Sequence, residues 1–192
     1  MEIEKIKVTL EGLSDIMFDR FYDHSGEDRP PGKKMYYDDK GNVVLPVTNL
    51  YSFLFRDEKP RGVIRFVEKN KAGEFIAIGQ GHVVINPSLI RFLDEKMKPI
   101  SFKGFDNGGK FWINDFEGGV TKMSGGKVIK QEPRERPVMR LPWFLVFDIT
   151  VIENNKVTPD KLQSWFEVGG LVTALGTHRP AYGRFMVSKW EV

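Results

Sequence analysis

The segment between Gly169 and Phe185 combines residue types that bind phosphate groups. Its glycines let the backbone approach a ligand closely or adopt a positive φ, and its cationic side chains donate hydrogen bonds to phosphate oxygens. A basic, glycine-containing turn beside a strand therefore predicts a cradle for a polyanionic backbone. The alternative is an ordinary turn that closes a compact domain. The residues that would form the cradle are Gly176, His178, Arg179, Gly183 and Arg184.

A second group of cations lies upstream in one short stretch of the chain. The formal net charge is only +3, so basic residues indicate nucleic acid only where they cluster. This cluster predicts an arm that contacts phosphates without reading bases, and the alternative is a solvated charged face. Its members are Lys127, Lys130, Arg134, Arg136 and Arg140.

Other chemistries lack the residues that they need. No cysteine occurs, which excludes disulfides, thiolate metal sites and a cysteine nucleophile. Asp15, Asp19 and Asp23 recur at every fourth position and predict one face of a helix, but the acidic residues follow no known metal-ligand pattern. The glycines at 79–81 lack the following lysine and hydroxyl residue of a nucleotide-binding loop. We therefore expect no metal and no cofactor.

The composition bounds the class of protein. A chain of 192 residues, of which 41% are hydrophobic, is long enough for one well-buried core, so we expect a single domain over residues 1–192. The N-terminus lacks the apolar run of a signal peptide, and no segment reaches the length of a membrane span. Together with the absence of cysteine, these features predict a soluble cytoplasmic protein.

The strongest secondary-structure signals are three strands and one helix. Thr158 followed by Pro159 predicts the N-terminus of a helix that runs to about Leu175, with Gly176 as its C-cap. The apolar run 143–152 is typical of a central strand. Alternation predicts a strand at 3–11, and the apolar segment 185–190 predicts the final strand.

Weaker signals fill the remaining chain. Thr48 or Asn49 predicts the N-cap of a short helix after a strand end at 43–46, and the glycines at 79–81 predict a hairpin. Residues 87–93 predict a short helix. Turn-rich insertions are expected at about 19–42, as a loop or loose hairpin, and at about 103–142, as irregular β-hairpins. The order of elements predicts an α+β fold of the ferredoxin-like (RRM-like) type, an antiparallel sheet with helices on one face.

Two segments resemble the RAMP superfamily of CRISPR-associated RNA-binding proteins. Leu45 to Arg56 is similar to the family's strand, proline-containing turn and short helix ending in arginine, and Leu175 to Phe185 is similar to its glycine-rich loop before the last strand. The resemblance implies a ferredoxin-like fold and a subunit that polymerises along a strand of RNA, with the basic arm reaching the neighbouring copy.

RNA-processing members of that family use a histidine with a tyrosine or lysine to activate a ribose 2′-hydroxyl without a metal, which implies a general base near neutral pKa. The candidates are His24, near Tyr22, Tyr36 and Tyr37, and His178, near Tyr182. The alternative is that both histidines are simply solvated in polar loops. His82, beside the predicted glycine hairpin, is expected to be structural.

The leading hypothesis is a non-enzymatic protein that binds single-stranded nucleic acid, with RNA favoured over DNA. One alternative is a metal-free endoribonuclease. Another is a protein-interaction module, such as a virus-encoded mimic of such a subunit, with no nucleic-acid contact. The expected partners are single-stranded RNA or DNA and further copies of the chain, and no membrane. Aromatic residues beside basic ones would suit base stacking, although most aromatic residues at such spacing belong to the core. The stacking candidates are Tyr51, Phe55, Phe111, Trp112, Trp143 and Trp190.

Overall fold

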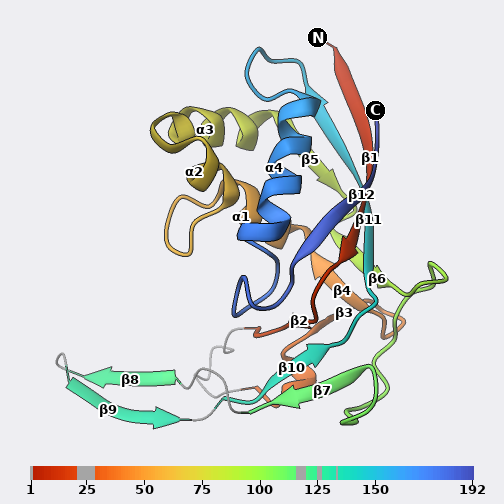
Figure 1. The fold of residues 1–192 in the computed structure, drawn as a ribbon, viewed down its shortest axis with the longest axis vertical. Helices are drawn as coiled ribbons and strands as arrows, with labels where there is room; N and C mark the ends of the chain where they lie inside the picture. Colours follow the sequence, from red (N-terminus) through yellow and green to blue (C-terminus); the bar gives the residue numbers. More distant parts are fainter. Residues whose placement is uncertain (1, 21–28, 116–119, 125–126, 133) are drawn as a thin grey trace.

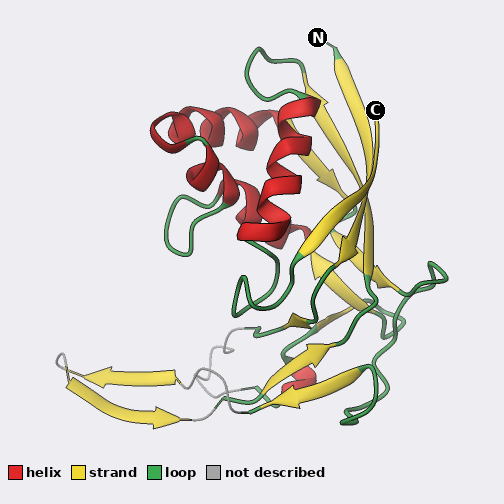
Figure 2. Cartoon of the chain, viewed as in Figure 1, coloured by secondary structure: helices red, strands yellow, loops and turns green. Residues whose placement is uncertain are grey.

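The computed structural model describes residues 2–20, 29–115, 120–124, 127–132 and 134–192. They form an α+β fold in which a mostly antiparallel sheet carries its helices on one face (Figures 1 and 2). The sheet order is β12 (Phe185–Glu191), β1 (Ile3–Gly12), β11 (Phe144–Ile152), β6 (Leu89–Leu93), β4 (Val43–Pro46) and β3 (Tyr36–Tyr37). A seventh strand, β5 (Val83–Asn86), also pairs with β11.

This order places the last strand beside the first, and the first beside β11, as in a ferredoxin-like sheet. Strand β1 pairs with β11 from Ile3 opposite Ile152 to Glu11 opposite Phe144. Its alternate side chains Ile6, Val8 and Leu10 are buried, because they face the helices. The predicted fold class is therefore confirmed, as are the three principal strands.

The helices pack on one face of the sheet and bury the hydrophobic core between them and the strands. Helix α1 (Val47–Phe55) follows β4, and α4 (Pro159–Val172) lies between β11 and β12. The other helices are α2 (Val63–Val67), α3 (Ala72–His82) and the short 3-10 turns η1 (Pro31–Lys33) and η2 (Lys69–Lys71). One continuous core runs from Ile6 to Phe185, and within it the ring of Phe53 lies 5.4 Å from those of Phe166 and Phe185.

Helix α4 begins as predicted and ends earlier. The side chain of Thr158 accepts a hydrogen bond from the backbone of Lys161 at 3.4 Å, and Pro159 occupies the first turn. After Val172 the left-handed position is taken by Ala174 (φ +60°), whose N–H donates to Gly169. Gly176 is therefore not the C-cap, and it lies in the loop beyond the helix.

Two weaker predictions are wrong. Residues 79–81 belong to α3 and not to a hairpin: a Cβ on Gly79 would lie 2.2 Å from the ring of Phe55, so this glycine allows close helix packing. Residues 89–93 form β6 and not a helix, because Ile90 and Phe92 alternate into the core while Leu89 and Arg91 face outward.

Shorter strands form a second layer below the main sheet (Figure 1). Strands β2 (Ile16–Met17), β10 (Arg136–Met139) and β7 (Phe111–Asn114) make a three-stranded sheet. Strands β8 (Val120–Ser124) and β9 (Lys127–Glu132) pair as a hairpin that extends away from the rest of the molecule in Figure 1. No helix in the described ranges is long and apolar enough to cross a membrane.

Candidate nucleic-acid interface

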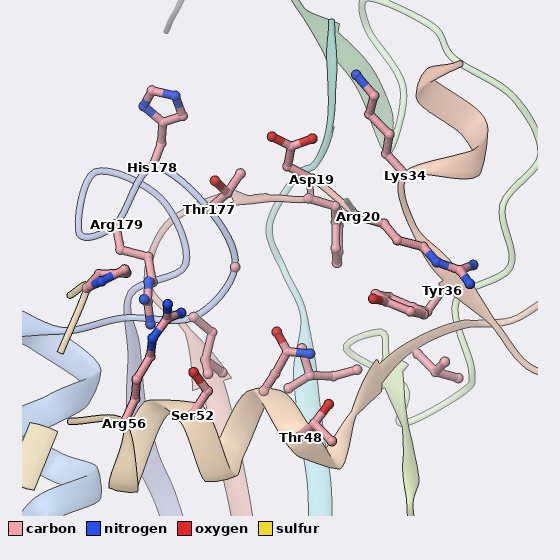
Figure 3. Close-up of a pocket in the computed structure, with 17 residues that line it drawn as sticks. Asp19, Arg20, Lys34, Tyr36, Thr48, Ser52, Arg56, Thr177, His178 and Arg179 are labelled. Atoms are coloured by element: carbon pink, nitrogen blue, oxygen red, sulfur yellow. The ribbon is translucent and has the colours of Figure 1, made fainter. Parts of the chain in front are cut away.

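A polar cleft of about 610 Å³ lies between helix α1, the segment after β2, strand β3 and the C-terminal loop. The two segments that carry the family resemblance form opposite walls, since Leu45 to Arg56 supplies one and Leu175 to Arg179 the other (Figure 3). The polar residues that line it are Asp19, Arg20, Lys34, Tyr36, Thr48, Asn49, Ser52, Arg56, Thr177, His178 and Arg179.

The C-terminal loop owes its shape to its own backbone. Gly183 has φ +75° and is buried, and a Cβ there would lie 1.9 Å from the carbonyl oxygen of Leu175. The N–H of Leu175 donates to Gly183 at 3.0 Å, and Gly183 donates to Asp15 at 2.7 Å. The N–H of Thr177 donates to Met17 at 3.0 Å. Gly183 thus closes the loop internally and does not line the cleft, whereas Gly176 does.

Two arginines converge at one end of the cleft. Figure 3 shows the side chains of Arg56, from α1, and Arg179, from the loop, pointing toward each other next to Ser52. Burial, and then the positive charge of Arg56, lower the pKa of Arg179. Neither arginine forms an ion pair with a carboxylate in the part of the chain that the structure describes. An anion between them would relieve this like-charge contact.

The other end of the cleft carries a stacked cation. The guanidinium of Arg20 lies 4.7 Å from the centre of the Tyr36 ring. Nearby, the Nζ of the buried Lys34 donates to the backbone carbonyl of Glu135 at 2.6 Å. The hydroxyl and amide groups of Thr48, Asn49 and Ser52 lie along α1 between the two cationic ends. This arrangement offers donors to several phosphates or sugars at once.

Asp19, the one carboxylate among the described lining residues, is already paired. Asp19 lies 3.4 Å from the Nε of Arg134 and 3.0 Å from the Nε of Arg136, and all three side chains are at most 9% exposed. Asp19 itself follows β2 in a loop and not in the helix that the spacing of the aspartates predicted. The two arginines that the sequence assigned to a phosphate-binding arm are therefore buried in the fold.

Arg140, the third arginine of the predicted arm, is also held by the protein. Its guanidinium donates to the backbone carbonyls of Gly109 and Asn107, at 2.5 and 2.6 Å, and lies 5.6 Å from the Trp112 ring. These contacts correct the expectation of one exposed arm. Lys127 and Lys130 lie in β9, and their side chains are outside the described part.

The structure separates the other predicted residues. Arg184 is exposed outside the cleft, with its backbone bonded to Ser14. The hydroxyl of Tyr182 accepts from Asn114 at 3.1 Å, and this tyrosine does not line the cleft, whereas His178 does. His24 and Tyr22 lie outside the described residues. His82 is bonded through Nδ1 to the carbonyl of Ile78 at 2.9 Å, in agreement with its expected structural role.

The helix-free face of the sheet has a balanced charge. A shallow hollow of about 410 Å³ there is lined by Lys5 and Lys7 together with Asp148 and Glu191. Cations and carboxylates are equal in number among its described lining residues, so this hollow has no excess of positive charge for a polyanion. The described residues contain no cluster of three or more acidic or histidine side chains able to hold a metal ion.

Several cleft residues escaped the sequence analysis as site residues. Arg20 and Lys34 carry no local pattern that distinguishes them from surface residues. Arg56 did carry a signal, because it ends the segment that resembles the family. Conversely, the aromatics proposed for stacking are mostly core: Phe55, Phe111 and Trp143 are at most 3% exposed.

Comparisons with known proteins agree with the fold. No family model and no curated protein matches the chain. Among solved structures, the chain is similar to one chain of the cryo-EM structure of the Type III-B Cmr-beta bound to cognate target RNA, with a TM-score of 0.55 and 14% identity. The match covers 99% of this chain and 60% of that chain, so this protein spans about three fifths of its length. At this identity the likeness shows the fold.

Proposed function

We propose that this protein is a RAMP-like subunit that binds single-stranded RNA in the cleft between α1 and the C-terminal loop. The observation that carries the proposal is the meeting of Arg56 and Arg179, from two distant segments, in a cleft where the one carboxylate of the described lining contacts other arginines. The similarity to a chain of an RNA-bound complex supports RNA as the ligand.

Binding of a labelled oligouridine, measured by fluorescence anisotropy over a series of salt concentrations, tests this proposal. Each phosphate contact to a single strand contributes about −0.7 to the slope of log K against log salt. Arg56→Ala and Arg179→Ala should each weaken binding and flatten this slope by about that amount. Arg184→Ala is the matched control, because this arginine lies in the same loop outside the cleft, and it should leave the slope unchanged. Salt-independent binding, or equal effects of all three substitutions, would contradict the proposal.

The preference for RNA rests on the uncharged lining. Thr48, Asn49 and Ser52 present donors and acceptors between the two cationic ends, where a ribose 2′-hydroxyl would find partners. Ser52→Ala and Thr48→Val should therefore weaken binding of RNA more than binding of DNA of the same sequence. Equal losses for both strands would remove this part of the proposal.

Assembly along a strand is the second part of the proposal. The projecting β8–β9 hairpin is the element available to reach a neighbouring copy (Figure 1). Sedimentation with oligouridines of increasing length should then show a stepwise increase in the number of copies bound. One copy per strand at every length would contradict polymerisation.

Metal-free cleavage is a second candidate because His178 is among the residues that line the same cleft. In that case the RNA would acquire 2′,3′-cyclic phosphate ends in the presence of a chelator, and His178→Ala would lower the rate by about two to four orders of magnitude. Intact RNA after long incubation would leave binding as the function.

A further inference from the structure

A second hollow of about 390 Å³ adjoins the cleft and continues it over the helices. Pro60 and Arg179 line both cavities, so the two are contiguous. The other residues of the second hollow come from α2, the segment before it, the end of α4 and the loop: Arg61, Arg65, Phe66, Val172, Thr173 and Pro180. None of its described lining residues is a carboxylate.

Phe66 gives this hollow an exposed aromatic ring. Helix α2 buries Val63 and Ile64 in the core, and its opposite face leaves Phe66 63% exposed. Among the exposed large hydrophobic side chains of the described residues, Phe66 is the aromatic one. Val172, which is 41% exposed, lines the same hollow, so Phe66 belongs to a small exposed apolar patch rimmed by arginines, the kind of surface that marks a binding site.

The charges around Phe66 favour a polyanion. Arg65 pairs with Asp57 at 2.6 Å, a carboxylate that lies outside the hollow. Arg61 is exposed and forms no ion pair within the described ranges, and Arg179 has only a 3.5 Å contact to the carbonyl of Ala174. An exposed aromatic ring that shares a hollow with two guanidinium groups, neither of them paired with a described carboxylate, is the combination that binds unpaired bases together with their phosphates.

We infer that Phe66 and Arg61 form a base-stacking subsite, at which a nucleotide of the strand leaving the cleft stacks on Phe66 while Arg61 contacts its phosphate. This inference rests on the proposed function and adds the path of the bound RNA, which leaves the cleft past Arg179 and crosses α2. A protein partner is the rival occupant, because Val168 and Leu171 of α4 are also exposed. The arginine-rich, carboxylate-free lining and its continuity with the cleft favour the nucleotide.

Substitution of Phe66 in the full chain tests the subsite. Loss of a stacked base weakens binding by about 5-fold to 150-fold, so Phe66→Ala and Phe66→Leu should both lower the affinity for oligouridine by at least about 5-fold. Phe66→Tyr should keep the wild-type affinity. The comparison with leucine separates stacking from simple apolar contact. Because Phe66 is exposed, the melting temperatures of these variants should stay close to that of the wild type, which verifies that each is folded.

The length of the oligonucleotide provides a second readout. With oligouridines of about 4 to 16 nucleotides, the range of site sizes for single-strand binding folds, the difference between wild type and Phe66→Leu should grow once the strand is long enough to leave the cleft. Binding that weakens with Arg179→Ala and not with Phe66→Leu at any length would overturn the subsite and leave the proposed function standing. Failure of the wild type to bind RNA would overturn both. Loss of self-association in Phe66→Asp, with RNA binding unchanged, would overturn the subsite in favour of a protein interface.

Discussion

The arginines at the start of β10 and those of the cleft have opposite electrostatic surroundings. Arg134 and Arg136 are almost fully buried and share the carboxylate of Asp19. Arg179 is half-buried beside Arg56, and the contacts of both in the described chain are to backbone carbonyls. A buried cation met by a carboxylate contributes to the integrity of the fold, whereas two adjacent cations without one keep their charge for an external anion. Clustering of basic residues therefore identifies a binding surface only where the protein leaves the charge unneutralised.

The largest effect is expected on the buried side of this comparison. Asp19→Asn should lower the free energy of unfolding by about 3–5 kcal/mol, because it removes the negative charge of a buried carboxylate that contacts two buried guanidinium groups. Urea denaturation measures the loss. Asp57→Asn is the control: it breaks the exposed pair with Arg65 and should cost about 0–1 kcal/mol. Similar losses in both variants would show that the Asp19 cluster is no more important than a surface ion pair.

The loop that presents Arg179 depends on Gly183. Gly183→Ala combines a left-handed backbone with a clash against Leu175. Gly41 has φ +77°, and a Cβ added there would meet no other atom within 4 Å, so Gly41→Ala isolates the backbone cost of about 1–2 kcal/mol. We expect Gly183→Ala to cost about 1–3 kcal/mol more than this control in thermal unfolding. Equal destabilisation by Gly183→Ala and Gly41→Ala would indicate that the loop can shift to relieve the clash with Leu175 without a loss of stability.

Arg140 should behave like the buried arginines and unlike Arg179. Arg140→Ala removes hydrogen bonds to two carbonyls and should destabilise the protein by about 1–2 kcal/mol. The salt slope of RNA binding should stay at the wild-type value under conditions where the variant is folded. A flatter salt slope with unchanged stability would instead indicate that Arg140 contacts RNA.

The smallest effect is expected on the helix-free face of the sheet. Replacing Lys5 and Lys7 together by alanine should change the affinity for oligouridine by less than about 2-fold, because nearby Asp148 and Glu191 already balance their charge. A loss as large as that of Arg179→Ala would place the strand on the sheet and contradict the cleft.

Local signals in the sequence were sufficient for the main elements. The apolar run that forms β11 and the Thr158-Pro159 start of α4 are set by neighbouring residues, and both were predicted. Gly79 misled the prediction because a glycine that permits helix packing against Phe55 is identical, in sequence, to one that permits a turn. The alternation of Ile90 and Phe92 was present but was outweighed by the preceding Pro87.

The site was predictable only in part, because its charges are paired over long distances. Asp19 and Arg136 are 117 positions apart, and no local pattern in either segment indicates that the two side chains pair. The loop residues His178 and Arg179 were found through their own composition, and the helix ending at Arg56 through its resemblance to a family. That these segments form one cleft follows from the packing of α1 and the loop beside β2, which no local pattern encodes.

The location of the bound strand can be mapped by photo-crosslinking to RNA carrying 5-bromouridine, followed by mass spectrometry of the crosslinked peptides. We expect crosslinks to Tyr36 and His178, which both line the cleft, and their loss in the Arg56→Ala, Arg179→Ala double variant. Crosslinks confined to β1, β11 and β12, on the helix-free face of the sheet, would contradict this expectation.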